Sequence, residues 1–268
     1  MKEAGFDEIR EIQYEILKVT AEFCDAYEIQ YFLTGGTLLG AVRHQGFIPW
    51  DDDIDIAMPR PDYNRFLEKS GGHLGKYYDV IVPENHPAHA RVFMRVVDNR
   101  TLCVHKYYRK KYRTGLGIDV FPMDGVPEEE AEYQEYFQTM RRLKKQFDLA
   151  QAAPFKSTGL LRMLAKTAAI IPAAVIGREK PYRKIMETAA KYPYEKSRRV
   201  GITTGFYFEK EVLVKKELYP AVDLPFEEST FHAPACYDKY LRQLYGDYMQ
   251  LPKEEERKPG HAFKVYWR

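Results

Sequence analysis

The amino-acid sequence predicts a mixed α/β (α+β) fold in which helices flank a twisted sheet. Two patterns indicate this class: apolar residues at helical spacing near the N-terminus, and later stretches in which apolar and polar residues alternate. The third observation is composition, because a 268-residue chain that is 45% hydrophobic and 14% aromatic can bury a large core. Disordered, collagen-like and low-complexity classes of protein are therefore excluded.

The first half of the chain alternates between expected helices and strands. The N-terminal helix has an apolar face with spacings of three and four residues: Ile9, Ile12, Ile16, Val19 and Phe23. Strands are predicted over residues 29–33, 52–58, 78–82, 91–97, 102–107 and 117–121, and short helices over 37–44 and 62–69. Pro122 is expected to end the last strand, because proline has no N–H to donate to a sheet.

The second half of the chain is predicted to be helical before strands return after residue 201. Helices are expected over residues 128–151, 158–176, 178–191 and 237–245. No internal repeat or Gly/Ser-rich linker divides the sequence. We therefore expect a single domain over residues 1–268, with a helical insertion or flank at 128–200.

Cysteine content and terminal sequence bear on localisation. The three cysteines (Cys24, Cys103 and Cys236) are far apart in the sequence, which argues against a disulfide scaffold or a cysteine zinc site and fits a reducing cytosol. The N-terminus lacks the apolar run of a signal peptide, and no uncharged apolar stretch is long enough to span a bilayer. A cytoplasmic protein is expected.

The acidic stretch FIPWDDDIDIAM is the sharpest motif. Alternate side chains of a strand lie on opposite faces, so Asp51, Asp53 and Asp55 are expected on one face, while Asp52 and two isoleucines lie on the other. Three carboxylates this close stay ionised only if cations neutralise them. Mg²⁺ and Mn²⁺ prefer oxygen ligands, so the pattern predicts a metal site, with a solvated acidic turn as the alternative.

Two weaker motifs lie on either side of this stretch. Gly35, Gly36 and Thr37 precede a short helix, and such a turn lets a phosphate approach the backbone at the positive end of the helix dipole, although a tight structural turn is the simpler interpretation. In GIDVFPMDG, Asp119 lies between two apolar residues and can project opposite them, whereas Asp124 is interpreted as a turn residue. An ordinary surface residue is the alternative for Asp119.

The order of these motifs resembles the nucleotidyltransferase superfamily: helix, strand, GG, short helix, a strand with D-x-D, and a later strand with a third aspartate. More narrowly, YFLTGGTLLGAVRHQGFIPWDDDIDIAMPRPDYNRF resembles the LicD family of phosphocholine transferases, and LYGDYMQLPKEEERKPGH resembles the C-terminal end of that family. The resemblance implies a nucleotidyltransferase-like twisted mixed sheet that binds two divalent ions, Mg²⁺ or Mn²⁺, through carboxylates.

The resemblance also implies roles for individual residues. Asp53, Asp55 and Asp119 would be the catalytic metal ligands, with Asp119 also helping to take the acceptor proton, and Asp51 would be a fourth metal ligand by its face. The donor phosphates would be lined by Gly35, Gly36 and Thr37. Further substrate contacts are expected from Arg43, Trp50 and His261, and Lys264 is considered with them because the C-terminal segment is expected to fold back over the site. The alternative for Arg43 is packing on Trp50.

The activity implied by the resemblance is transfer of phosphocholine from CDP-choline to a sugar hydroxyl of a cell-surface glycan, of the teichoic acid or lipopolysaccharide type, with release of CMP. Such transfers depend on positioning and charge neutralisation more than on covalent chemistry. Transfer of ribitol or glycerol phosphate, nucleotidyl transfer with release of pyrophosphate, and a non-catalytic binding module remain alternatives. No nucleic-acid partner is expected, because the sequence has no RNP-like motif.

Aromatic residues offer candidates for a cage around the trimethylammonium group, by cation–π attraction, with ordinary packing as the alternative. These candidates are Trp50, Tyr107, Tyr108 and Trp267.

A strongly basic segment covers residues 141–184, which hold eleven Lys or Arg and two acidic residues although the whole chain has a net charge of only +2. Within it, TAAIIPAAVIG (167–177) is apolar and interrupted by Pro172. An apolar segment bordered by bases suits the interface of an anionic membrane, so peripheral contact at the inner face of the plasma membrane is expected. A buried helical hairpin is the alternative. The bases that follow the apolar segment are Arg178, Lys180, Arg183 and Lys184.

Overall fold

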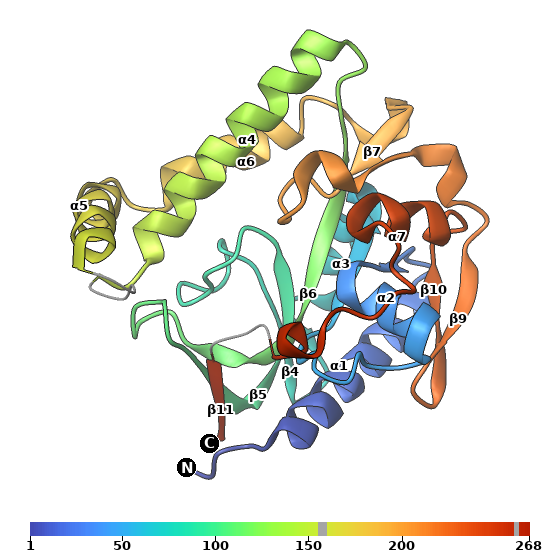
Figure 1. The fold of residues 1–268 in the computed structure, drawn as a ribbon, viewed down its shortest axis with the longest axis horizontal. Helices are drawn as coiled ribbons and strands as arrows, with labels where there is room; N and C mark the ends of the chain where they lie inside the picture. Colours follow the sequence, from blue (N-terminus) through green and yellow to red (C-terminus); the bar gives the residue numbers. More distant parts are fainter. Residues whose placement is uncertain (155–159, 260–262) are drawn as a thin grey trace.

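The computed structural model describes residues 1–154, 160–259 and 263–268. A curled mixed sheet forms its centre, and a group of helices extends from it on one side (Figure 1). The predicted α/β class is therefore confirmed. No helix within the described ranges is both long and apolar enough to cross a membrane.

The central sheet has the strand order β1-β2-β6-β5-β4-β3. These strands are β1 (Phe32–Leu33), β2 (Asp55–Pro59), β6 (Thr114–Gly125), β5 (Met94–His105), β4 (Tyr78–Ile81) and β3 (His73–Leu74). The strands β2 and β6 run parallel, and the other neighbours in this order are antiparallel. Further strands are β11 (Phe263–Trp267) against β5, β7 (Arg199–Gly201) and β8 (Val212–Val214) at the end of β6, and a separate hairpin of β9 (Val222–Phe226) and β10 (Ser229–Ala233).

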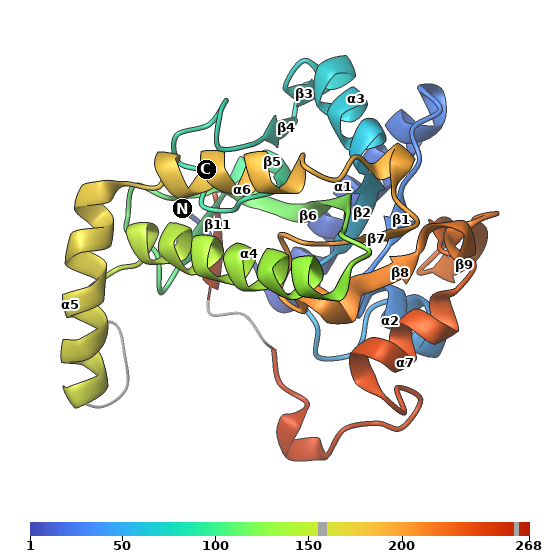
Figure 2. The ribbon, with the colours of Figure 1, turned by 90° about the horizontal axis from the view of Figure 1, so that it is seen from above.

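Helices pack against this sheet and against one another. They are α1 (Phe6–Ala26), α2 (Gly35–His44), α3 (Arg60–Ser70), α4 (Glu130–Gln151), α5 (Leu160–Ile176), α6 (Glu179–Ala189) and α7 (Tyr237–Tyr245). Short 3-10 helices cover Tyr194–Lys196, Phe208–Glu211, Lys215–Leu218 and Glu254–Glu256. The helices α1 and α3 contact the central strands, whereas α4 packs against α5 and α6, and α5 lies at the outer end of this group (Figure 2).

Most expected elements form with shifted ends. The strand predicted over 52–58 begins at Asp55, and the helix predicted over 37–44 begins at Gly35. The two strands predicted over 91–97 and 102–107 are one strand, β5, whose pairing with β6 is irregular between Asp98 and Cys103. The helix over 237–245 has the predicted bounds. The assignment of one domain with an insertion at 128–200 stays a prediction.

The expectation that Pro122 ends its strand is wrong. The strand β6 continues to Gly125, and Pro122 pairs with Met58 of the parallel neighbour β2. On the other side of β6, pairing with β5 is found up to Val120 and pairing with β7 starts at Asp124. Pro122 therefore falls between two neighbouring strands, where its missing N–H costs no ladder hydrogen bond.

Candidate active site

Asp55 and Asp119 are direct neighbours on two adjacent parallel strands. The register of β2 and β6 sets Asp55 opposite Asp119, and the next pair along is Ile56 opposite Val120. Side chains alternate between the two faces of a sheet, so the aspartates share one face and the fully buried apolar pair shares the other. The structure thus brings together two carboxylates that are far apart in the sequence.

Arg95 of β5 extends this row across a third strand, because it pairs with Asp119 in the register of β5 and β6. Its Nε donates a hydrogen bond to Oδ1 of Asp119 at 2.6 Å, and a terminal nitrogen donates to the Gly117 carbonyl at 2.9 Å. A guanidinium fixed at two points holds the carboxylate in a defined orientation. Sequence reasoning missed Arg95, which lies in an otherwise ordinary strand.

Three more aspartates lie just before β2. Asp52 and Ile54 are buried whereas Asp51, Asp53 and Asp55 are partly exposed, so burial alternates as predicted. However, the carboxylate oxygens of Asp51, Asp52 and Asp53 lie within 4.8 Å of one another. The loop before the strand therefore adds Asp52 to the group of oxygens, although the face argument placed it on the core side.

The electrostatics of Asp55 reflect this crowding. Burial raises the pKa of Asp55 well above its ordinary value, and the charges of Asp53, Asp119 and Asp51 raise it further. A carboxyl group in such a setting ionises fully only when positive charge is brought close to it. Oxygen ligands in this number fit Mg²⁺ or Mn²⁺, so the residues present suit the expected ions.

The first turn of α2 lies against these carboxylates. A Cβ on Gly36 would lie only 2.7 Å from Oδ2 of Asp51, so a larger residue at this position would displace the Asp51 carboxylate. Gly35 has a φ of +54° and faces Oδ2 of Asp55, to which a Cβ would be 3.4 Å. Oγ1 of Thr37 accepts a hydrogen bond from the Asp55 N–H at 2.8 Å. The positive end of the α2 dipole therefore faces the acidic group.

Glu211 is a buried carboxyl group near this site that the sequence analysis also missed. Its oxygens accept hydrogen bonds from the Tyr240 hydroxyl at 3.2 Å and from the Tyr207 N–H at 3.3 Å. Burial raises the pKa of Glu211 to about 7, although both hydrogen bonds act to lower it. The charge of Glu211 also contributes to the raised pKa of Asp55. No local pattern marks this residue, because its burial depends on α7 and on the adjoining loop.

Arg43 lies at the far end of α2 from Gly35, and Trp50 packs against a residue of the C-terminal segment. Arg43 is in the last turn of α2, about 12 Å along the helix from Gly35. It donates a hydrogen bond to the Tyr248 carbonyl at 2.6 Å, so it holds the segment that follows α7. The guanidinium that lies over the Trp50 ring, 5.6 Å from its centre, belongs to Arg257. Both side chains thus face the C-terminal segment.

The C-terminal candidates are placed only in part. His261 lies outside the described residues. Lys264 and Trp267 belong to β11, which pairs with β5 at the sheet edge. Lys264 forms an ion pair with Glu3 at 2.9 Å, and the Trp267 indole donates to Glu8 at 2.9 Å. These two side chains fasten β11 to the N-terminal region, which favours the packing interpretation of Trp267.

Asp124 is not the turn residue that the sequence suggested. It is a buried residue of β6 with 2% of its surface exposed, and its two oxygens accept hydrogen bonds from Arg60 at 2.6 and 2.8 Å. Arg60 begins α3, so this ion pair joins a helix to the sheet. The interaction is structural, because a buried carboxylate needs such a partner.

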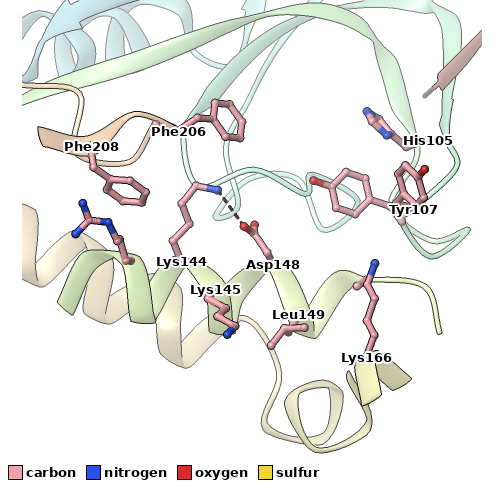
Figure 3. A pocket seen from close by; sticks show the side chains of 13 residues that line it. His105, Tyr107, Lys144, Lys145, Asp148, Leu149, Lys166, Phe206 and Phe208 are labelled. Atoms are coloured by element: carbon pink, nitrogen blue, oxygen red, sulfur yellow. Dashed lines mark hydrogen bonds and ion pairs between the residues drawn. The ribbon is translucent and has the colours of Figure 1, made fainter. Parts of the chain in front are cut away.

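A cavity of about 560 Å³ lies between the end of β5, the helices α4 and α5, and the loop at 205–208 (Figure 3). Most of the side chains that line it are aromatic or basic. These lining residues include His105, Tyr107, Tyr108, Arg141, Lys144, Lys145, Asp148, Lys166, Phe206 and Phe208.

Several contacts join this cavity to the carboxylates. The Phe206 ring lies 6.5 Å from that of Phe121, two residues beyond Asp119 on β6. Tyr108 also lines a smaller pocket that includes Arg95. Burial raises the pKa of Tyr108, and the charges of Asp148 and Asp119 add to this effect while nearby arginines oppose it. The cavity is therefore linked to Asp119 through Tyr108 and Arg95, although Asp119 does not line it.

The glycine turn of α2 and the paired strands that carry Asp55 and Asp119 define a nucleotidyltransferase-type domain. A family model described as "LicD/FKTN/FKRP, nucleotidyltransferase domain" matches residues 28–167, which include the turn and both strands.

The chain is also similar to individual proteins. It is 30% identical over 275 residues to "Lipopolysaccharide cholinephosphotransferase LicD" of Haemophilus influenzae, an alignment that covers 99% of each chain. It is 49% identical over 55 residues to an uncharacterised protein of Rickettsia typhi, covering 20% of this chain and 18% of the other. A match to "Ribitol 5-phosphate transferase FKRP" of Homo sapiens has 38% identity over 55 residues, covering 20% of this chain and 11% of FKRP. The chain belongs to the LicD family and is a phosphotransferase.

Proposed function

We propose that the protein transfers phosphocholine from CDP-choline to a sugar hydroxyl of a cell-surface glycan, of the lipopolysaccharide or teichoic acid type, and releases CMP. The observation that carries this proposal is the similarity to a lipopolysaccharide cholinephosphotransferase over 99% of both chains. The adjacent carboxylates of Asp55 and Asp119 support it, because neighbouring carboxylates on one face of a sheet can hold the cations that phosphoryl transfer uses.

Asp51, Asp53, Asp55 and Asp119 are our candidate metal ligands, and the crowding that raises the pKa of Asp55 supports a need for cations there. Two bound Mg²⁺ or Mn²⁺ ions would supply the positive charge that polarises the attacked phosphate and stabilises the leaving oxygen.

The protein's own groups account for positioning. We place the donor phosphates at the first turn of α2, where Gly35 and Gly36 let the carboxylates of Asp55 and Asp51 approach and where backbone N–H groups and the helix dipole favour negative charge. Arg95 holds Oδ1 of Asp119, so we assign Oδ2 to the acceptor side, where it would accept the proton of the attacking hydroxyl. These groups align the reactants, which is the main requirement of phosphoryl transfer.

Transfer of ribitol or glycerol phosphate is the second candidate. It is favoured by the short match to a ribitol 5-phosphate transferase, which covers 20% of this chain. The two candidates differ in the head group of the CDP-linked donor and share the same release of CMP. Nucleotidyl transfer would instead release pyrophosphate from CTP.

The test is to incubate the protein with Mg²⁺, a lipopolysaccharide that lacks phosphocholine, and CDP-choline, CDP-ribitol or CDP-glycerol. Release of CMP from CDP-choline, together with choline in the glycan, is expected. Asp55→Asn is the inactive control. Preference for CDP-ribitol or CDP-glycerol would select the second candidate, and pyrophosphate from CTP without CMP from any of these donors would contradict both.

A further inference from the structure

We infer that the cavity between the end of β5, α4 and α5 binds a negatively charged group of the acceptor, a phosphate or a carboxylate carried by the glycan. This inference rests on the proposed function only in naming the ligand as the acceptor. The cavity and its charge are features of the fold itself.

The charge of the cavity is the first argument. Arg141, Lys144 and Lys145 reach it from α4 and Lys166 reaches it from α5, whereas Asp148 is the one carboxylate among the described residues that line it. Asp148 is already paired with Lys144 at 3.0 Å, and Arg141 forms an ion pair with Glu209. The excess of positive charge therefore comes from Lys145 and Lys166. A cavity with this excess of positive charge attracts anions.

The aromatic rings strengthen the argument, because cationic side chains already lie over them. Nζ of Lys144 is 4.8 Å from the centre of the Phe206 ring, Nζ of Lys166 is 5.6 Å from that of Tyr107, and the Arg141 guanidinium is 5.0 Å from that of Phe208.

A trimethylammonium group would therefore meet charges of its own sign at these rings. Tyr108, the remaining tyrosine of the expected cage, has the Arg91 guanidinium 5.3 Å from its ring centre. The expectation that Tyr107 and Tyr108 cage choline thus does not fit their surroundings, whereas an anion does.

The position of the cavity indicates the acceptor rather than the donor. The α2 turn lies against Asp55 of β2, whereas the cavity is lined by the end of β5, by α4 and α5 and by the loop at 205–208. No described residue lines both the turn and the cavity, so donor phosphates at the turn would leave the cavity free for the acceptor. A volume of about 560 Å³ can hold one or two sugar units with their charged group.

The test uses binding, which does not depend on transfer activity. Calorimetric titrations compare glucose 6-phosphate, glucuronate, glucose and CMP. The test variant is Lys145→Gln/Lys166→Gln, and the matched control is Arg142→Gln/Lys196→Gln, which removes two exposed bases that do not line the cavity. We expect one or both anionic sugars, and not glucose, to bind to wild type and control. Their affinity should fall by about tenfold or more in the test variant.

Three results would overturn the inference: no binding of either anionic sugar, equal binding to wild type and test variant, or loss of CMP binding in the test variant, which would place the donor nucleotide in the cavity. Failure of the proposed function gives a different pattern, namely no CMP release from any donor while the anionic sugars still bind in a manner that depends on Lys145 and Lys166.

A separate observation, the exposure of α5, carries a second proposal. This helix lies at the edge of the molecule (Figure 2), and its apolar side chains Leu164, Ile171, Val175 and Ile176 are exposed. Val175 has 84% of its surface exposed, whereas Ile170 on the inner side has 1%. The buried-hairpin alternative therefore does not describe the outer face of α5.

The charges around this face indicate its partner. Lys180 and Lys184 of α6 are exposed and line a surface pocket together with Ile176 of α5. Arg178 does not belong to this basic group, because it is buried and donates hydrogen bonds to the Pro87 carbonyl at 3.0 Å and to Gln151 at 3.3 Å. We propose that α5 docks on an anionic lipid bilayer, with its apolar face in the interface and the lysines of α6 at the headgroups.

Vesicle flotation tests this docking. Wild type should float with vesicles of phosphatidylcholine and phosphatidylglycerol, less in high salt, and not with phosphatidylcholine alone. Ile171→Ser/Val175→Ser and Lys180→Gln/Lys184→Gln should each reduce flotation several-fold. The matched control is Met249→Ser/Leu251→Ser, at exposed apolar positions far along the chain from α5. Absence of flotation, or equal flotation of all variants, would overturn the proposal. So would a dimer in sedimentation equilibrium that Ile171→Ser/Val175→Ser dissociates, because a second copy would then cover α5.

Discussion

Arg95 and Asp119 face each other across β5 and β6, with Nε of the arginine 2.6 Å from Oδ1 of the aspartate. The same guanidinium donates a hydrogen bond to the Gly117 carbonyl, so the plane of the guanidinium is fixed relative to β6. A carboxylate held in this way keeps one oxygen in a constant direction, which matters when the other oxygen has to meet a substrate.

The first prediction is that Arg95→Lys lowers kcat by about tenfold or more while the KM for the donor changes little. Lysine keeps the charge but lacks the planar fork that binds two acceptors. Steady-state kinetics with CDP-choline measure the split. Arg100→Lys is the control, since Arg100 makes a comparable ion pair with Asp98 on the same strand, at 2.5 Å. An equal loss in both variants, or a loss matched by unfolding, would show that Arg95 has no role in positioning.

The second prediction concerns the carboxylates. Asp53→Asn, Asp55→Asn and Asp119→Asn should each lower transfer by about 1,000-fold or more, because they remove charge from the proposed metal ligands. Asp52→Asn should act through stability instead, since Asp52 has 5% of its surface exposed. Rates and urea unfolding of the four variants are compared. Equal, mild losses at all four positions would mean that the assignment of faces is wrong.

The third prediction is that Asp55→Asn has opposite effects on stability without and with metal. Because burial and neighbouring acids raise the pKa of Asp55, its ionisation near neutral pH destabilises the folded protein, and asparagine removes that cost. The variant should therefore melt above wild type in EDTA. A large excess of Mg²⁺ should stabilise wild type by about 2.7 kcal/mol at 100 times Kd, and the variant by much less. If the melting temperature of wild type does not change when Mg²⁺ is added, the proposed metal site is contradicted.

The fourth prediction follows from the pKa of Glu211, which burial raises from an ordinary 4.5 to about 7. Between these values the folded protein holds a proton that the unfolded chain has released, so the free energy of unfolding falls as the pH rises. Glu211→Gln removes this pH dependence. Above pH 7, the free energy of unfolding of the variant should be higher than that of wild type by roughly 3 kcal/mol. Urea unfolding at about pH 5 and about pH 8 measures the difference. The exposed Glu135→Gln is the control, and parallel pH profiles for wild type and Glu211→Gln would refute the shift.

The fifth prediction is structural. Asp124→Asn should lower the free energy of unfolding by about 3 kcal/mol or more, because it leaves the partly buried Arg60 guanidinium without its counter-charge. Glu217→Gln breaks the more exposed pair with Lys239 and should cost less than about 1 kcal/mol. Chemical denaturation of both variants measures the two free energies of unfolding. Similar small decreases in the two variants would show that the Arg60–Asp124 ion pair does not fix α3 to the sheet.

Sequence reasoning succeeded where a side chain's role follows from its immediate neighbours. The alternation of aspartates and isoleucines predicted which of residues 51–56 are buried, and helical spacing predicted α1 and α7. The same reasoning failed where a distant segment decides the outcome. Asp124 resembles a turn residue until Arg60 is seen beside it, and Glu211 has no distinctive neighbours in the sequence.

Tertiary contacts likewise determine which apolar and basic residues are buried. The sequence predicted an apolar helix over 158–176, but only packing on α4 determines that Ile170 is buried and Val175 exposed. Arg178 belongs to a basic run in the sequence, yet the backbone carbonyls it meets make it part of the core. The sequence shows only that Arg178 and Lys180 are both basic, and could not predict that Arg178 is buried while Lys180 is exposed.

The chain leaves the sheet at the end of β6 and returns to it beside the same point, where Asp124 pairs with Gly201 and the Val126 N–H donates to the Arg199 carbonyl at 3.2 Å. The helices α4, α5 and α6 therefore belong to an excursion from the sheet whose two ends lie side by side. Lengthening such a closed excursion is inexpensive, since each doubling costs only about 0.6 kcal/mol in chain entropy. The cations of the cavity lie on this excursion, whereas Asp55 and Asp119 lie on the sheet. Under the proposed acceptor site, changes in these helices would alter the choice of acceptor and leave the positions of Asp55 and Asp119 on the sheet unchanged.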